Sequence, residues 1–496
     1  MNTRRSSSSG SRSASPDSYR DFLLGEQERG STHARPYWYG SPKSKKRRYL
    51  YIAGGVVVLV VLSLLILQSW APLPLPFSTS IAPTVTTPKD QSTRLESYVN
   101  GPPTTKFRDN LKPELKYITS WLDAGWTNDV ITYMNLLYLA TVTERIPVIG
   151  MFIPSHIGFE VESIDFGKVF DVPRLSKALN IPVLEWHEVK DRNSTETDEL
   201  GCWNVWEAVQ DREHKPRPSR LVDRLKLDIS YTKAPTWVKI LPNYEHDLHS
   251  SFFSLASLGF PEVRAESLVP PLESPINHAR LPPDEHMLCY DYLYYTCSSH
   301  PFEFEYDFSP AWRFVGQHMR WAPELEKLAD QYVRKAIGLS ESDGPTPAYI
   351  AIHARHSDFK VWCEGDPFDG CFGTIPAISR RVEEVRQELR EKKGLEIQHV
   401  IMTSDERNST WWDQVREQGW LVLDHSHTVE DHGIWYPLLI DATIQSNGEG
   451  FIGTDHSTVS VVARRRVQSW RNGATRTVKW GNAHADDHRR RREFFI

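Results

Sequence analysis

Between residues 347 and 467 the chain alternates short apolar runs with longer amphipathic segments, and this alternation limits the fold more than any other feature of the sequence. The apolar runs are residues 349–352, 399–402, 420–423 and 450–452. The segments with apolar residues at helical spacing are 375–390, 410–418, 435–442 and 457–467. Strands separated by helices pair in parallel, and the helices then cover both faces of the sheet. The pattern therefore predicts an α/β domain that binds its ligands at one edge of the sheet.

Three polar side chains directly follow the first apolar run: His353, Arg355 and Asp358. They would lie at the carboxyl end of a strand, where open α/β sheets bind ligands. Arginine suits a phosphate at such a place, because its planar fork donates two hydrogen bonds at once and keeps its charge. A salt-bridged edge of the core would also place a His-x-Arg sequence there. Both interpretations stay open on this triplet alone.

Small hydroxyl residues follow the last apolar run, in the sequence Gly-Thr-Asp-His-Ser-Thr-Val-Ser at 453–460. At the start of a helix, such residues can offer side-chain and backbone donors to an anionic diphosphate. Helix capping alone would also place Ser or Thr there. Gly448, Gly450 and Gly453 have GxGxxG spacing, but they overlap the apolar run at 450–452 instead of following it, as a dinucleotide-binding loop would. A Walker motif is not present in the sequence. The sequence therefore predicts neither a dinucleotide cofactor nor an ATP site.

A glycine-containing loop, residues 122–129, runs into a predicted helix over 130–140, and a predicted strand follows at 146–149. Such a loop offers free backbone amides and the positive end of a helix dipole to a ligand. The alternative is that Thr127 or Asn128 simply caps the helix.

The region from about 150 to 345 is less informative. Residues 182–186 have the pattern of a strand, 261–283 are Pro-rich and predicted to be irregular, and 314–337 are predicted to form a helix between two lobes. Several aromatic residues of this region could line a groove for a sugar or peptide, or could pack in the core. They are Trp203, Trp206, Tyr290, Tyr292 and Trp312.

Taken together, these stretches resemble the GDP-fucose protein O-fucosyltransferase family. Residues 353–359 are similar to its His-x-Arg-x-Gly-Asp-Phe signature, with Ser357 in the place of the usual glycine. Residues 124–129 are similar to its Gly-x-Phe-x-Asn-Gln loop. Residues 400–405 and 449–466 resemble its strand ending in Thr/Ser-Asp and its Phe-Ile-Gly-x-x-x-Ser-Ser-Phe region. The resemblance covers roughly residues 120 to 470.

The resemblance implies two Rossmann-like lobes of the GT-B type, with residues 111–335 on the acceptor side and 336–496 binding the nucleotide sugar. It also implies transfer of fucose from GDP-fucose to a hydroxyl of a protein or glycan, without a cofactor or metal. Arg355 would then neutralise the departing β-phosphate, and Asn128 would lie near the reacting centre. The residues expected to bind the donor are His353, Asp358, Asp441 for guanine, and Ser457, Thr458 and Val459 for the diphosphate.

The sequence departs from the family in the loop before the first long helix. Ala124 and Gly125 stand where family members have an arginine or a glutamate, so no acceptor-side base is predicted. Two other hypotheses therefore stay open. One is a membrane-anchored binder of nucleotide sugars or glycans without activity, and the other is a glycosyltransferase with another donor. An Asp-x-Asp motif of the metal-dependent kind is not present in the sequence.

The amino-terminal part predicts a single membrane span. Residues 49–67 carry no charge and are long enough, as a helix, to cross roughly 30 Å of hydrocarbon. The basic cluster at 43–48 precedes them, which predicts a cytosolic, disordered tail over 1–48 and a luminal head. Residues 68–110 are predicted to form a Pro/Ser/Thr-rich stem. The expectation is a single-pass type II protein of the Golgi or endoplasmic reticulum membrane.

The chain has five cysteines, all of which follow the predicted span. An oxidising lumen allows up to two disulfides with one thiol left over. Cys363 and Cys371 could pair, as could Cys289 and Cys297, and the spacing alone does not determine the connectivity. Zinc is disfavoured, because no CxxC pair is present. The sequons at Asn193 and Asn408 agree with a luminal head. Because the net charge of −6 includes a basic tail, the head is more acidic still, which disfavours nucleic-acid binding.

Overall fold

The computed structural model describes residues 95–486, apart from 123, 156, 159, 211–213, 341, 364–367, 369 and 483. These residues all belong to the second of two compact units, which spans Pro88–Ile496. Within this described part, no helix has both the length and the apolar character needed to cross a bilayer. The predicted tail, membrane span and most of the predicted stem lie outside it.

The first of two large sheets has six strands, all parallel, in the order β3-β2-β1-β7-β4-β5. The strands are β1 (Tyr117–Ser120), β2 (Ile146–Ile149), β3 (Leu184–Glu185), β4 (Asp198–Asn204), β5 (Leu227–Lys233) and β7 (Met287–Tyr290). From β1 the chain adds β2 and β3 on one side and later places β7 on the other, so the strand order reverses at β1. Ligands of open α/β sheets bind at such a reversal.

The helices around this sheet are mostly short, and the longest, α5 (Trp126–Thr143), starts soon after β1. The others are α4 (Phe107–Asn110), α6 (Phe166–Val169), α7 (Val172–Leu179), α8 (Trp186–Val189), α9 (Trp206–Val209), α10 (Arg220–Arg224), α11 (Phe252–Ser257), α12 (Pro261–Ser267) and α13 (Pro310–Phe314). A small separate sheet pairs β6 (Ser250–Ser251) with β8 (Thr296–Cys297).

The second large sheet has five parallel strands in the order β11-β10-β9-β12-β13. The strands are β9 (Tyr349–Ala354), β10 (His399–Ser404), β11 (Leu421–Val422), β12 (Gly450–Thr454) and β13 (Ala474–Val478). Here the order reverses at β9, which pairs with β10 on one side and β12 on the other. The predicted βα alternation is therefore confirmed, and its first strand lies at the centre.

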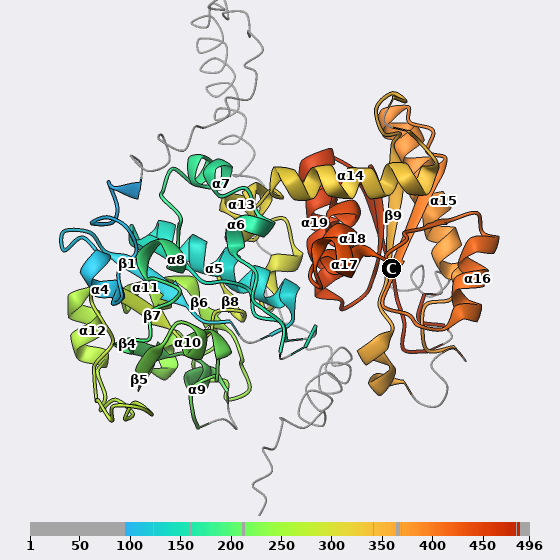
Figure 1. Ribbon diagram of the computed structural model, residues 1–496. Coiled ribbons are helices and arrows are strands. Elements are labelled where there is room, and N and C mark those ends of the chain that lie inside the picture. The colour runs from blue at the N-terminus through green and yellow to red at the C-terminus, as the bar shows by residue number, and fades with distance from the viewer. Residues whose placement is uncertain are drawn as a thin grey trace, which may run out of the picture. The chain divides into compact units, whose positions relative to one another are not determined.

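Helices cover both faces of the second sheet, as Figure 1 shows around β9. They are α14 (Pro323–Ile337), α15 (Ile375–Lys393), α16 (Ser409–Glu417), α17 (Thr428–His432), α18 (Tyr436–Asn447) and α19 (Thr458–Arg471). Alternate residues of β9 point to opposite faces, as the strand period of two requires. Ile350 and Ile352 belong to the cluster with α15 and α16, whereas Ala351 belongs to the cluster with α18 and α19.

Several element boundaries differ from the prediction. The helix expected over residues 314–337 is divided into α13, a 3-10 turn (Gly316–His318) and α14, and α14 begins at Pro323 because proline suits the first position of a helix. Pro261 likewise begins α12 in a region predicted to be irregular. Residues 95–110 are not an extended stem, because Val99 and Phe107 are buried against the first lobe.

Two disulfides and one buried free thiol account for the five cysteines. Cys363 pairs with Cys371, which confirms one of the two pairs that the sequence allowed. The other pair, Cys289 with Cys297, is wrong, because Cys289 pairs with Cys202 and leaves Cys297 reduced. The Cys202–Cys289 bond joins β4 and β7 within the first sheet. The connectivity depends on this strand pairing, which sequence spacing did not reveal.

Candidate functional site

Arg355 leaves the carboxyl end of β9, at the reversal of the strand order, and two carboxylates hold its guanidinium. The Nε atom lies 2.9 Å from Asp358 Oδ1, and one terminal nitrogen lies 2.7 Å from Asp405 Oδ2. The other terminal nitrogen has no partner among the described residues, and the side chain is 23% exposed. The predicted Arg355 is therefore accessible to a ligand and still has donors to offer.

His353, the last but one residue of β9, is buried beneath the first turn of α19. Its Nδ1 lies 2.8 Å from Ser460 Oγ, and that oxygen accepts a hydrogen bond of 2.9 Å from the backbone N–H of Thr454. Desolvation lowers the pKa of His353 to about 3, with Arg355 and His356 adding positive charge nearby. The imidazole is thus neutral at physiological pH, and its hydrogen bond fixes the strand against the helix.

The first turn of α19 contains the three residues predicted to hold a diphosphate. Ser457 is the N-cap, and its hydroxyl accepts from the backbone N–H of Ser460. Thr458 and Val459 begin the helix and are half-buried. A helix of this length presents free N–H groups and a positive dipole end at this turn. The capping interpretation of Ser457 is correct, and it does not exclude an anion, because a single cap leaves other N–H groups free.

The start of α5 meets the start of α19. Thr127 Oγ1 and Thr458 Oγ1 are 2.7 Å apart, which brings the reversal points of the two sheets together. Asn128 is half-buried, and its side-chain amide has no hydrogen-bond partner within the described part of the chain. The predicted cap is wrong, because Gly125 is the N-cap and the helix begins at Trp126.

Asp441, predicted to contact guanine, lies on α18 and is already engaged. Its Oδ1 is 2.9 Å from His425 Nε2, and its side chain is 24% exposed. His425 in turn contacts the hydroxyl of Thr428 at 3.0 Å and stacks on the ring of Tyr332. The carboxylate is oriented by this chain of contacts and retains a second oxygen for a ligand.

The carboxyl ends of β9, β12 and β13 surround a hollow. Its lining includes His353, Arg355, His356, Thr454 and Trp480. Thr454 closes one side by accepting a hydrogen bond from the backbone N–H of Arg355 (2.9 Å) and donating one to the carbonyl of His353 (3.0 Å). These contacts fix the backbone from which Arg355 projects.

Three contributing residues were not predicted as site residues: Asp405, Thr454 and Ser460. Asp405 was recognised only as the end of a strand, although its carboxylate also accepts a 2.8 Å hydrogen bond from the backbone N–H of His356. The position of Asp405 directly after Ser404, at the end of a predicted strand, was the sequence signal that could have identified it as a site residue. Four of the five aromatic residues considered for a groove are buried in the core, namely Trp203, Tyr290, Tyr292 and Trp312.

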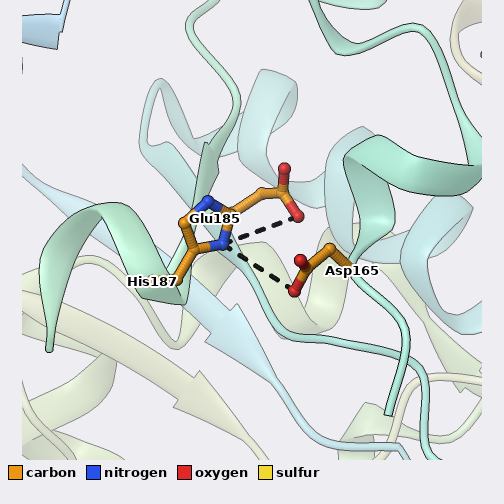
Figure 2. A group of neighbouring side chains, drawn as sticks. All are labelled: Asp165, Glu185 and His187. Carbon is orange, nitrogen blue, oxygen red and sulfur yellow. Dashed lines mark ion pairs between the residues drawn. The ribbon is translucent and has the colours of Figure 1, made fainter. Parts of the chain in front are cut away.

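One group in the described part of the chain has the composition of a metal site. The ligand atoms of Asp165, Glu185 and His187 lie within 4.8 Å of one another. Figure 2 shows His187 Nδ1 facing both carboxylates, each at 3.9 Å. Burial raises the pKa of Glu185 to about 7, and Arg192 already forms a 2.7 Å ion pair with Asp165. Asp165 therefore has a cationic partner from the chain itself.

Neither a family model nor a curated protein matches the chain. Among solved structures, it is similar to POFUT1 in complex with GDP-fucose, with a TM-score of 0.46 and 13% identity over 75% of this chain and 99% of that one. It is also similar to the fucosyltransferase NodZ from Bradyrhizobium, with a TM-score of 0.36 and 14% identity over 71% and 92% of the two chains. The first of these structures contains GDP-fucose, and the second is described as a fucosyltransferase. At 13% and 14% identity the similarity concerns the fold and assigns a role to no individual residue.

The low pKa of His353 predicts a specific pH dependence of stability. Between about pH 3 and 6.5 the unfolded chain binds a proton at this residue and the folded chain does not, so stability should rise with pH over this window. His353→Asn keeps an acceptor for Ser460 but cannot titrate. Urea unfolding at pH 4.5 and 6.5 should show a pH-dependent loss that is about 2–3 kcal/mol larger in the unmutated protein, at ~1.4 kcal/mol per pH unit. Identical pH profiles would contradict the assignment.

Proposed function

We propose that the chain is a glycosyltransferase that moves fucose from GDP-fucose to a hydroxyl of a protein or glycan. The observation that carries the proposal is the position of Arg355, at the strand-order reversal of one sheet and at the end of a family-like motif. The Thr127–Thr458 contact brings the corresponding point of the other sheet to the same place. A donor bound at Arg355 could therefore meet an acceptor held by the first lobe, in the arrangement of a GT-B fold.

The proposed chemistry depends on charge that develops on the departing diphosphate. Arg355 would stabilise this charge with its free terminal N–H groups, and Asp405 would hold the guanidinium in place. The first turn of α19 would bind the diphosphate through its N–H groups and the Thr458 hydroxyl. His353 would contribute by position rather than by proton transfer, because its low pKa makes it a weak base and its Nδ1 is already hydrogen-bonded to Ser460. No step in this scheme requires a metal or cofactor.

The charges around Arg355 also support a second candidate function, the binding of a nucleotide sugar without transfer. One guanidinium faces two carboxylates, so an anionic donor has to compete with Asp358, whose side chain is 50% exposed. A protein that binds a nucleotide sugar without transferring it would show the same geometry. Hydrolysis of several nucleotide sugars by the purified protein separates these functions, because a binder would release no free sugar.

For location, the proposal is a type II membrane protein with its head in the lumen of the Golgi or endoplasmic reticulum. Asn193 is exposed on a loop of the first lobe, which suits a glycan. In sealed microsomes, the head should resist added protease, and endoglycosidase should shift the unmutated protein but not Asn193→Gln by the mass of that glycan. Asn408→Gln is the matched control. Digestion of the head from the cytosolic side would refute this orientation.

Recognition of guanine predicts a loss of GDP affinity in Asp441→Ala. A hydrogen bond to a charged group contributes roughly 1.5–3 kcal/mol, which corresponds to about a 10- to 150-fold weaker dissociation constant. Titration calorimetry with GDP and with UDP measures the dissociation constants of the unmutated protein and of Asp441→Ala. Asp424→Ala is the control, because Asp424 is an exposed carboxylate that pairs with Lys335. Equal affinity of the unmutated protein for GDP and UDP would end the guanine assignment.

Arg355→Lys should lower turnover by ~10²–10³-fold, because the charge remains but the planar fork is lost. Binding of GDP should fall much less, since the first turn of α19 still holds the diphosphate. Initial rates with GDP-fucose and calorimetry with GDP give the two quantities.

The melting temperature of Arg355→Lys should equal that of the unmutated protein, so that a loss of turnover cannot be attributed to unfolding. A folded Arg355→Lys protein with the original turnover would refute the catalytic role. If instead the variant unfolds, Arg355 is part of a salt-bridged core edge, the alternative that the sequence left open. Asp405→Asn is a second test of the role of Arg355, because it weakens the ion pair that positions the guanidinium and leaves the arginine in place.

A further inference from the structure

His356 follows Arg355 directly, and two of its groups hold it to the end of the neighbouring strand β10. The residue is buried, with 3% of its surface exposed. Its Nδ1 atom lies 2.8 Å from Glu406 Oε2, and its backbone N–H donates a 2.8 Å hydrogen bond to Asp405 Oδ1. The residue next to the arginine of the candidate site therefore contacts both acidic side chains that follow β10.

Aromatic rings fix the orientation of the imidazole. The ring of Phe372 lies parallel to that of His356, with 2° between the planes and 4.2 Å between the ring centres. The ring of Trp411 meets the same imidazole at an angle of 74°, with its centre 5.0 Å away. A disulfide joins Cys371, the residue before Phe372, to Cys363. The imidazole therefore cannot turn away from its carboxylate partner without displacing packed rings.

Glu406 is itself fixed by the backbone around it. Its Oε1 atom accepts hydrogen bonds of 2.7 Å from the backbone N–H groups of Arg407 and Asn408. Its carbonyl accepts a 2.9 Å hydrogen bond from the indole N–H of Trp412. The carboxylate is thus a rigid acceptor, and the contact with His356 ties the chain after β9 to it.

The protonation states allow a directed hydrogen bond. Desolvation lowers the pKa of His356, although Glu406 and Asp405 act against this shift, so the imidazole is neutral at physiological pH. Desolvation opposes the ionisation of Glu406, but hydrogen bonds from the backbone N–H of Asn408 and from His356 hold its pKa below the usual value. A neutral imidazole has one N–H, and the ionised carboxylate requires it on Nδ1. A hydrogen bond to an ionised acceptor is stronger than one between neutral groups.

We propose that His356 is a positioning residue for Arg355, and the proposal rests on the function proposed above. The backbone N–H of Arg355 is held by Thr454, and the next residue is held by Glu406 through its side chain. Asp405 joins the two, because its Oδ1 accepts from the backbone of His356 and its Oδ2 pairs with the guanidinium. A displacement of His356 would therefore move both Asp405 and the guanidinium that it holds.

Two substitutions separate the hydrogen bond from the packing. His356→Phe keeps a ring against Phe372 but cannot donate to Glu406, whereas His356→Asn loses the ring and keeps an amide N–H in the place of Nδ1. The full-length protein in detergent is assayed with GDP-fucose, and GDP affinity is measured by calorimetry. His356→Phe should lower turnover by ~10–100-fold, the loss that a displacement of about 1 Å can cause. His356→Asn should retain more turnover than His356→Phe.

A purely structural role predicts the reverse order, because the asparagine leaves a gap beside the aromatic rings and the phenylalanine does not. GDP affinity should change little in either variant, since the first turn of α19 still holds the diphosphate. His286→Phe is the matched control. His286 contacts the carbonyl of Lys112 at 2.9 Å and the ring of Tyr117, and it lies before β7 in the first lobe.

A folded His356→Phe protein with the original turnover would overturn the proposal, as would a larger loss in His356→Asn. If His356→Phe does not fold, Glu406→Gln decides by the same assay, because it removes the charge of the acceptor and keeps its shape. Original turnover in that variant rejects the positioning role.

Absence of turnover in the unmutated protein would contradict the proposed function and not the positioning role. Crystal structures of the variants then decide. The 2.7 Å contact between Arg355 and Asp405 should be lost in His356→Phe and kept in His356→Asn. An unchanged contact in His356→Phe would reject the positioning role.

Discussion

The pairing of β9 with β10 on one side and β12 on the other is the constraint on which the candidate site depends. Because both pairings are parallel, the ends of the three strands lie at the same edge, and the chain leaving β9 has to pass between its neighbours. Asp405 after β10 and Thr454 at the end of β12 are thereby brought to Arg355 from opposite sides. Residues about 50 and 100 positions away in the sequence thus fix one residue, Asp405 through its side chain and Thr454 through its backbone N–H.

This arrangement also determines how much of the site was predictable. His353, Arg355 and Asp358 form a local pattern after an apolar run, so their place at the end of a strand followed from the sequence. Asp405 and Ser460 act through contacts between elements, which no spacing along the chain reveals. The resemblance to a family supplied roles for Asn128 and Asp441 but not the His425 contact that orients Asp441.

The fold of the first lobe was harder to predict for a related reason. Its strand β5 has the sequence Leu-Asp-Ile-Ser-Tyr-Thr-Lys, whose polar residues suggest a solvated face. In the structure Asp228, Ser230 and Thr232 are fully buried. Asp228 is satisfied there by the hydroxyl of Ser274 and by the backbone N–H groups of residues 276 and 277. Predicting a strand from its alternating pattern assumes that polar residues are exposed to solvent. The assumption fails here, because the loop containing residues 274–277 supplies Asp228 with hydrogen bonds inside the protein. The second lobe, whose strands are apolar on both faces, gave the expected signal.

The close approach of β12 to α19 has a consequence for how such a chain can evolve. A Cβ atom on Gly453 would lie 2.6 Å from the Cβ of Ser460 and 2.8 Å from the ring of Phe451, so even alanine does not fit. The same closeness lets Ser460 reach both Thr454 and His353. A lineage that replaces this glycine has to move the helix outward and lose the serine contact in the same step. Substitutions at 453, 460 and 353 should therefore be inherited together, and descendants that keep the histidine should keep the glycine.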